Sequence, residues 1–303
     1  MTKNRWLVLV GGGACGRWQG GALEALYRAG LLNDLSGIVG TSVGGLNACV
    51  LAAGLAQAQG IDLLKSTWAA IQKDEDIYRP SVVGVAASPW WNVLSILGLA
   101  RSFVWGPGAL DRSALETLCA KVFGELTTND IKGKTGLVLM TRAYNYEEGL
   151  VHTLQGRLQD MALATSAIEG AFPSWQGYGD GGAGDNAPID AALALGAEQI
   201  LVVYTGPDRP APLRGPIFLG KVGAQTHTTG LANIEDVAAH ITMANEDLVD
   251  QEAQAAIARG VAVIDCYPLT DTGNFLDFRE RGLWERGVAE AQTAIQAAKG
   301  AGW

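Results

Sequence analysis

The sequence has few of the residues from which zinc sites, disulfide frameworks and nucleic-acid surfaces are built. Its 303 residues include three histidines and four cysteines, and no two cysteines form a CxxC pair. This spacing indicates neither a zinc knuckle nor a dense disulfide framework, so we expect reduced, mostly buried thiols, which suit a cytosolic protein. The net charge is −9 and no run of lysine or arginine stands out. A basic nucleic-acid footprint is therefore absent, and charge does not favour contact with anionic lipid.

Long apolar runs at the N-terminus and common metal motifs are also missing. The run WLVLV at 6–10 is too short for the hydrophobic core of a signal peptide and stops at glycines. We therefore predict a cytoplasmic protein without a signal peptide. The sequence contains no HExxH, EF-hand or Walker A pattern, so we predict no metal and no cofactor.

Glycine and apolar residues, by contrast, are abundant. Hydrophobic residues make up 48% of the chain and charged residues 17%, which suffices for a sizeable core and excludes a disordered chain. Glycine accounts for 40 residues, well above its usual share of about 7%. Such a surplus indicates many tight turns or close approaches of the backbone.

A strand, a glycine-rich turn and a helix follow one another twice within the first sixty residues. The strand at 6–10 leads to a helix at 18–29, and the short strand at 38–39 leads to a helix at about 44–57. This order predicts an α/β fold with a mostly parallel central sheet. The remaining pattern predicts helices at 61–73, 158–169, about 233–258 and about 283–298, strands at 136–143, 149–154, 201–205 and 261–266, and a Pro-rich loop at 206–230.

The first candidate site is the GxSxG pattern at 40–44. In a nucleophile elbow the serine occupies a strained strand-to-helix turn, and the glycines two residues to either side allow that turn and close helix packing. Here the pattern follows a short strand and precedes a helix, as an elbow requires, and a helix N-terminus favours developing negative charge. The alternative is a glycine-rich turn in which Ser42 caps the helix.

The second candidate is the run from Gly11 to Gly16, directly after the first strand. It fits GxGxxG, the dinucleotide fingerprint, which also needs an acidic residue about 20 positions later. Asp34 precedes the second strand, and no acidic residue stands at the end of that strand, so the dinucleotide fingerprint is incomplete. Consecutive glycines can instead direct several N–H groups toward one point, as an oxyanion hole does. A tight turn that binds nothing is the third interpretation.

The third candidate is Asp180, which is flanked by glycines in GDGG at 179–182. The glycines leave room around the carboxylate, although turns of this composition are common on protein surfaces. Together the three patterns resemble those of the patatin-like phospholipase family. The matching segments are GGGACGRWQGGAL (11–23), GTSVGGLNA (40–48), TSAIEGAFPSW (165–175) and GDGGAGDNAPIDAALALGA (179–197), with weaker matches at 108–118 and 276–287.

The resemblance implies a single three-layer α/β/α domain over 1–303 that hydrolyses acyl esters, as lipases, esterases and phospholipases A do. It makes Ser42 the nucleophile and Asp180 the proton acceptor of a Ser–Asp dyad. Many bacterial members have a basic residue where this chain has Cys15, and Arg17 lies two residues further on, so no arginine contribution is implied here. The oxyanion hole would be lined by Gly11, Gly12 and Gly13, and the motifs supported by Gly16, Gly40, Gly44, Gly181 and Gly182.

A dyad raises a question of basicity. An aspartate has no tautomer to fix, so it needs no third residue to orient it. Its usual pKa of about 3.9 is nevertheless far from the optimum for a base near pH 7. Desolvation raises the pKa of a carboxyl group, and Phe172, Trp175 and Tyr178 are apolar neighbours of Asp180 in the sequence.

Three alternatives stay open at this point. A Ser-His-Asp triad of the α/β-hydrolase type is met in chain order by Ser42, Asp180 and either His227 or His240. That fold places several strands before the elbow, whereas only two fit before Ser42, so we expect His227→Ala and His240→Ala to retain most esterase activity. The other two are a nucleotide-binding α/β protein that uses Gly11–Gly16 and a non-catalytic relative with the same fold that binds lipid or a partner.

The segment 80–105 is the candidate for contact with lipid. Residues 80–100 carry no charge, which in length alone permits a membrane span, but Pro89, Asn92 and three serines argue against one. A buried core segment and an apolar flap over the site are the other interpretations. Trp90, Trp91 and Trp105 suit a water–lipid boundary, so peripheral membrane contact is expected through this segment.

Overall fold

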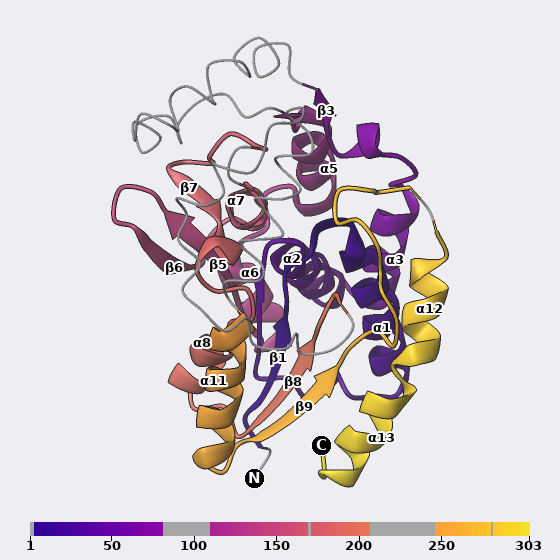
Figure 1. The fold of residues 1–303 in the computed structure, drawn as a ribbon, viewed down its shortest axis with the longest axis vertical. Coiled ribbons are helices and arrows are strands. Elements are labelled where there is room, and N and C mark those ends of the chain that lie inside the picture. The colour runs from indigo at the N-terminus through magenta and orange to yellow at the C-terminus, as the bar shows by residue number, and fades with distance from the viewer. Residues whose placement is uncertain (1–2, 81–109, 169–170, 207–245, 280) are drawn as a thin grey trace.

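The computed structural model describes residues 3–80, 110–168, 171–206, 246–279 and 281–303 (Figure 1). Residues 81–105 of the predicted flap lie outside the described residues, and so do its three tryptophans. The same holds for 207–230 of the predicted Pro-rich loop and for the first part of the helix predicted at about 233–258.

A seven-stranded sheet forms the centre of the fold (Figure 1). Its order is β6-β5-β2-β1-β8-β9, and β7 pairs with the C-terminal half of β5. The pairs β1–β2, β1–β8, β2–β5 and β8–β9 are parallel, whereas β6 and β7 run antiparallel to β5. The strands are β1 (Arg5–Leu9), β2 (Gly37–Thr41), β5 (Val138–Asn145), β6 (Leu150–Leu154), β7 (Tyr178–Asp180), β8 (Gln199–Val203) and β9 (Ala262–Cys266), with a separate pair β3 (Arg79–Pro80) and β4 (Leu110–Asp111).

Helices cover both faces of the sheet (Figure 1), with α8 and α11 on one face and α1, α2, α3 and α12 on the other. The predicted three-layer α/β/α fold is thereby confirmed. The helices are α1 (Gly16–Arg28), α2 (Val43–Ala56), α3 (Ile61–Ala69), α5 (Ser113–Phe123), α6 (Thr128–Thr135), α7 (Leu158–Thr165), α8 (Ile189–Ala194), α11 (Glu246–Ala258), α12 (Leu283–Glu290) and α13 (Gln292–Gly300), and the short 3-10 turns are η1 (Gly13–Cys15), η2 (Asp74–Asp76) and η4 (Gly181–Ala183).

The apolar residues of β1 alternate between two buried cores. Leu7 and Leu9 belong to the core beneath α1 and α2, whereas Trp6 and Val8 belong to the core beneath α8. A strand that is buried on both faces reads as a continuous apolar run. That is why the sequence at 6–10 shows no alternation with polar residues.

The strand order brings the first two sequence patterns together. In the register of β1 and β2, Leu9 lies opposite Gly40. The turns that follow, at Gly11 and Ser42, therefore leave the same edge of the sheet. β1 lies between β2 and β8, so the strand order reverses at β1. The edge of the sheet at the carboxyl end of β1 is therefore a topological switch point, where doubly wound folds bind their ligands.

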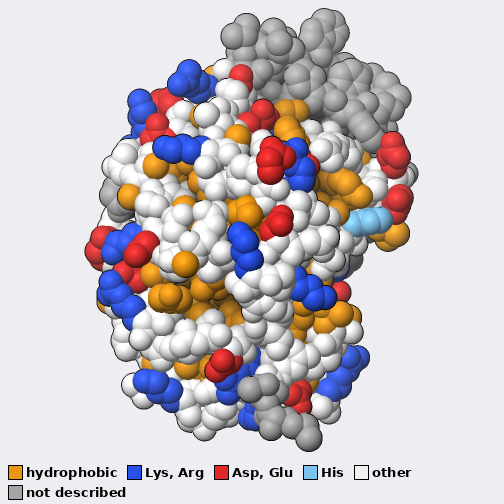
Figure 2. All heavy atoms as spheres, turned by 180° about the vertical axis from the view of Figure 1, so that it is seen from behind, with side chains coloured by type: hydrophobic (Ala, Val, Ile, Leu, Met, Phe, Trp, Pro, Cys, Tyr) orange, Lys and Arg blue, Asp and Glu red, His pale blue; other side chains and the backbone are white. Residues whose placement is uncertain are grey.

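Three smaller points test the expectations from the sequence. The single helix predicted at 283–298 is wrong, because the chain forms two helices, α12 and α13, that meet at Ala291. The four cysteines, all within the described residues, are buried and form no disulfide, as expected. In the described part of the chain no helix is long and apolar enough to span a membrane. Figure 2 shows acidic and basic side chains interspersed on the face that it displays.

Candidate active site

Ser42 occupies the strained turn that the GxSxG pattern predicts. It precedes α2 directly and has φ 54° and ψ −129°, a conformation that costs of order 1–3 kcal/mol for a residue other than glycine. The flanking glycines are required by close packing. A Cβ atom on Gly40 would lie 2.4 Å from the Gly44 carbonyl oxygen, and one on Gly44 would lie 2.2 Å from the carbonyl oxygen of Leu9 in β1.

Asp180, at the end of β7, contacts Ser42 directly. The Ser42 hydroxyl donates to Asp180 Oδ2 at 2.6 Å, although 138 positions separate the two residues. The other carboxylate oxygen, Oδ1, accepts from the Gly182 N–H at 2.8 Å, which holds the carboxylate in one orientation. Ser42 is 7% exposed and Asp180 is 8% exposed, so the pair is nearly closed to solvent.

The environment of Asp180 makes it a better base than an ordinary aspartate. Burial raises its pKa from 3.8 to about 6, against the opposing effect of the hydrogen bonds from Ser42 and Gly182. The carboxylate is therefore mostly ionised at neutral pH and has gained basicity. Trp175, one of the aromatic residues near Asp180 in the sequence, has other partners: its indole N–H donates to Asp160 at 3.0 Å, and its ring lies beneath the Arg112 guanidinium.

Thr165 holds the backbone of Ser42, a contact that the sequence did not predict. Its hydroxyl oxygen accepts from the Ser42 N–H at 2.9 Å, and its hydroxyl donates to the Arg142 carbonyl at 2.5 Å. Thr165 is fully buried at the end of α7. Its only signal in the sequence is its place at the start of the matching segment 165–175.

The glycine turn after β1 lies beside Ser42. A Cβ atom on Gly11 would lie 3.0 Å from Ser42 Cβ. The Gly11 N–H donates to the Asn186 carbonyl at 3.2 Å, while the N–H groups of Gly12 and Gly13 have no acceptor among the described residues. Gly13 has φ 53°, a conformation that favours glycine. Two adjacent amides of this turn are thus available to an oxygen atom.

The Arg17 side chain lies against Trp68, Ile71 and Phe278. Its guanidinium lies 5.3 Å from the centroid of the Trp68 ring and donates to the carbonyls of Ile71 and Phe278. The side chain is 3% exposed. It therefore braces the wall of the cavity described next.

An apolar cavity with a volume of about 70 Å³ is lined by Ser42 and continues between α2, α3 and α5. Its few polar side chains are already satisfied: Asn47 accepts from Trp68 Nε1, Thr67 donates to the Leu63 carbonyl, and Ser166 donates to the Ala162 carbonyl. The wall therefore suits a hydrocarbon chain. Its apolar residues include Val43, Leu46, Val50, Leu64, Trp68, Ile71, Ile77, Leu115, Leu118, Val122, Phe123, Ile168, Phe172 and Phe278.

One group of carboxylates has ligand-like spacing. In the part of the chain that the structure describes, the oxygens of Asp185, Asp190 and Glu252 lie within 4.8 Å of one another. The Arg142 guanidinium already forms ion pairs with two of these carboxylates, at 2.6 Å from Asp185 and 3.1 Å from Asp190. Burial raises the pKa of Glu252 to about 8, which further lowers the negative charge of the group. It therefore works as an ion-pair network that anchors the chain after Asp180.

The histidines of the alternative triad, His227 and His240, lie outside the described residues. His152 is in β6, as the sequence predicts, where its Nε2 lies 2.7 Å from the Glu148 carboxylate and its ring packs against Tyr178. The nucleotide alternative loses two donors, because the N–H groups of Ala14 and Cys15 are bonded to protein carbonyls.

Comparison with known proteins points to one family. The model of the patatin-like phospholipase family matches residues 7–193. Among solved structures, VipD from Legionella pneumophila is 15% identical with a TM-score of 0.44, over 98% of this chain and 67% of VipD. The type III effector ExoU of Pseudomonas aeruginosa is 15% identical with a TM-score of 0.41, over 97% of this chain and 53% of ExoU, so the chain spans about half of ExoU. No curated protein matches the sequence. Because the family model covers more than half of the chain, the protein belongs to the patatin-like phospholipase family.

Proposed function

We propose that the protein is a serine acyl-ester hydrolase of the lipase or phospholipase A type, which works through an acyl-enzyme on Ser42. The observation that carries this proposal is the 2.6 Å contact between Ser42 Oγ and Asp180 Oδ2, with Ser42 in the wall of an apolar cavity. A nucleophile within hydrogen-bond reach of a base, next to space for the substrate, is the arrangement that acyl transfer requires.

The proposed reaction has two halves. In the first, Ser42 Oγ attacks the ester carbonyl carbon while Asp180 accepts the serine proton, and the tetrahedral intermediate then expels the alcohol, which takes that proton. In the second, Asp180 takes a proton from water, the resulting hydroxide attacks the acyl-enzyme, and the acid leaves as Ser42 regains its proton. Both intermediates carry an oxyanion, for which we propose the N–H groups of Gly12 and Gly13 as donors, with Gly11 lining the hole.

Covalent labelling at Ser42 tests the proposal. A fluorophosphonate reacts with an activated serine hydroxyl, so we expect one adduct per chain at Ser42 together with hydrolysis of p-nitrophenyl esters. The Ser42→Ala variant is the control and should show neither. Lipid binding without labelling or turnover in the wild type would favour the non-catalytic alternative. Nucleotide binding without turnover would favour the nucleotide-binding alternative.

The cavity predicts a preference for longer acyl groups. Burial of each methylene group contributes about 0.8 kcal/mol, and the apolar wall follows α2 from Val43 to Val50, about 10 Å at the rise of an α-helix. We therefore expect kcat/KM to increase from acetate through butyrate to octanoate esters of the same phenol. A series of p-nitrophenyl esters measures this, and an activity that is flat or falls with chain length would contradict the assignment of the cavity.

The pH dependence of activity follows from the raised pKa of Asp180. Because the base must be ionised, kcat/KM should fall about tenfold per pH unit below a pKa of about 6 and level off above it. An aspartate with its ordinary pKa of 3.8 would instead remain fully active near pH 5. Initial rates on a water-soluble ester, measured from about pH 4.5 to 8.5, distinguish the two profiles.

A further inference from the structure

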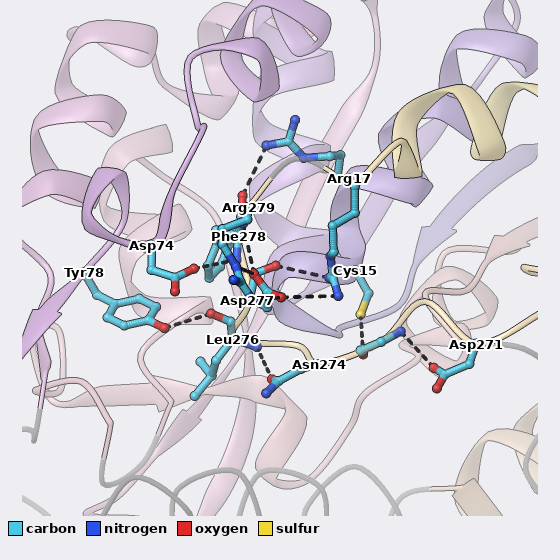
Figure 3. A network of polar contacts seen from close by, with 12 residues as sticks. Cys15, Arg17, Asp74, Tyr78, Asp271, Asn274, Leu276, Asp277, Phe278 and Arg279 are labelled. Atoms are coloured by element: carbon cyan, nitrogen blue, oxygen red, sulfur yellow. Dashed lines mark hydrogen bonds and ion pairs between the residues drawn. The ribbon is translucent and has the colours of Figure 1, made fainter.

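The segment 271–279, which we call the C-terminal strap, links β9 to α12 and lies outside the residues that match the family model. Figure 3 shows it between Asp74 and Tyr78 on one side and Cys15 and Arg17 on the other. The bonds that fasten it run from the Phe278 N–H to Asp74 Oδ1 at 2.7 Å, from the Tyr78 hydroxyl to the Leu276 carbonyl at 2.8 Å and from the Cys15 thiol to the Gly273 carbonyl at 3.4 Å.

The C-terminal strap is also linked by hydrogen bonds to the glycine turn that follows β1. The Phe275 carbonyl accepts from the Ala14 N–H at 2.6 Å. The Thr272 hydroxyl donates to the Thr205 carbonyl at 2.7 Å, and the Thr205 hydroxyl donates in turn to the Gly11 carbonyl at 2.6 Å. Both threonines are about 95% buried, since Thr205 is 6% and Thr272 is 5% exposed.

The bond from Thr205 fixes the direction of a neighbouring amide. In a planar trans peptide the C=O and the next N–H point in opposite directions. Since the Gly11 carbonyl points at Thr205, the Gly12 N–H points away from Thr205. The Gly12 carbonyl accepts from the Cys15 N–H at 3.1 Å. By the same geometry, the Gly13 N–H points away from the Cys15 N–H. Thr205 packs so closely here that a Cβ atom on Gly12 would lie 2.1 Å from its hydroxyl oxygen.

We infer that Thr205 is a positioning residue of the hydrolase site: its hydroxyl holds the Gly11–Gly12 peptide in the orientation that presents the Gly12 N–H to the oxyanion. This inference rests on the proposed function. It adds a residue beyond the family match; the C-terminal strap contacts that residue through the bond from Thr272 to the Thr205 carbonyl. A hydroxyl that orients an oxyanion donor acts on the transition state and leaves ground-state binding of the ester unchanged.

Thr205→Val tests the inference because valine keeps the shape of threonine and lacks its hydroxyl. Removal of one oxyanion donor lowers kcat by about 100- to 1,000-fold, and a donor that is misdirected but present should cost less. We expect kcat to fall about 10- to 100-fold with KM for a soluble ester within about twofold of wild type. Thr205→Ser keeps the hydroxyl and should restore most of kcat.

Thr272→Val separates positioning from stability. It also removes a buried hydroxyl-to-carbonyl bond, but it leaves the donor of the Gly11 carbonyl in place, so it should lower Tm about as much as Thr205→Val and kcat much less. Equal losses of kcat in the two variants, a loss confined to KM, or no rescue by Thr205→Ser would overturn the inference. A wild-type protein without esterase activity would instead reject the proposed function, which the assay establishes first.

Discussion

Asp180→Asn is expected to lower kcat for ester hydrolysis by about 100- to 10,000-fold, the usual contribution of a general base. Asparagine has nearly the same shape and can still accept from the Gly182 N–H, which now holds Asp180 Oδ1. It cannot take a proton from Ser42, so the hydroxyl loses its acceptor. KM should change little, because the cavity wall does not include Asp180.

Stability measurements show whether such a loss is catalytic. In the wild type the folded-state pKa of Asp180, about 6, lies above the ordinary value of 3.8. The folded protein therefore binds more protons than the unfolded chain between those values, and this carboxyl makes stability fall as pH rises from about 4 to 6. Asp180→Asn removes that penalty, so its Tm at pH 7 should equal or exceed that of wild type.

Asp185→Asn is the matched comparison. Asp185 is also buried, its pKa is also raised by burial, and it follows Asp180 by five positions, but it faces Arg142 at 2.6 Å. Its substitution leaves Arg142 paired with Asp190 at 3.1 Å and should affect kcat far less than Asp180→Asn. If the two variants lose similar activity, the loop as a whole is needed and Asp180 has no special role as a base.

A second expectation concerns how the two dyad residues combine. Groups that act as a unit show non-additive losses. With Ser42 replaced by alanine, Asp180 has no proton to accept, so Ser42→Ala/Asp180→Asn should be no less active than Ser42→Ala alone. A further loss in the double variant would mean that Asp180 also serves a reaction in which Ser42 takes no part.

Local patterns predicted the parts of the site that depend on local geometry. Gly40, Ser42 and Gly44 have a fixed spacing because a strand-to-helix turn has a fixed shape, and the glycine run after β1 is equally local. The contact between Ser42 and Asp180 is not local, and only the resemblance to a family predicted it. Nothing in the order of residues states that β7 lies against β5, which is what carries Asp180 to the switch point.

The supporting residues were beyond sequence reasoning for a related reason. Thr165 makes two hydrogen bonds with backbone groups through its hydroxyl, and Thr205 makes one. A hydroxyl that bonds to a distant carbonyl follows no periodicity and forms no motif. The stripe of Leu115, Leu118 and Val122 on α5 is periodic, but periodicity alone does not distinguish the wall of a cavity from a filled core.

The break between α12 and α13 is a further feature that the sequence pattern did not predict. The nearest glycine, Gly287, lies four residues before Ala291 within α12, and no proline lies nearby. Ala291 is fully buried, and its N–H still bonds to the Gly287 carbonyl. The break therefore has no local signal at Ala291, and a one-dimensional pattern does not contain the packing of the two helices on the rest of the fold.

Gly44→Ala is expected to destabilise the fold by about 3 kcal/mol or more, at the upper end of the cost of overpacking. The new Cβ atom would lie 2.2 Å from the Leu9 carbonyl oxygen and 2.5 Å from the Leu9 carbonyl carbon. Both belong to the backbone of the central strand β1, which is bonded on each side to a neighbouring strand. Neither atom can move aside without disturbing the sheet, so helix α2 must shift instead and take Ser42 with it.

Gly133→Ala is the control, because Gly133 is also helical, in α6, and a Cβ atom there would meet nothing within 4 Å. Alanine in place of glycine within a helix stabilises it by about 0.5–1 kcal/mol, so this variant should be slightly more stable than wild type. Urea unfolding of the two variants measures the difference. The proximity of α2 to β1 is what makes glycine necessary at position 44, so a Gly44→Ala protein as stable as wild type would mean that the elbow does not approach the sheet this closely.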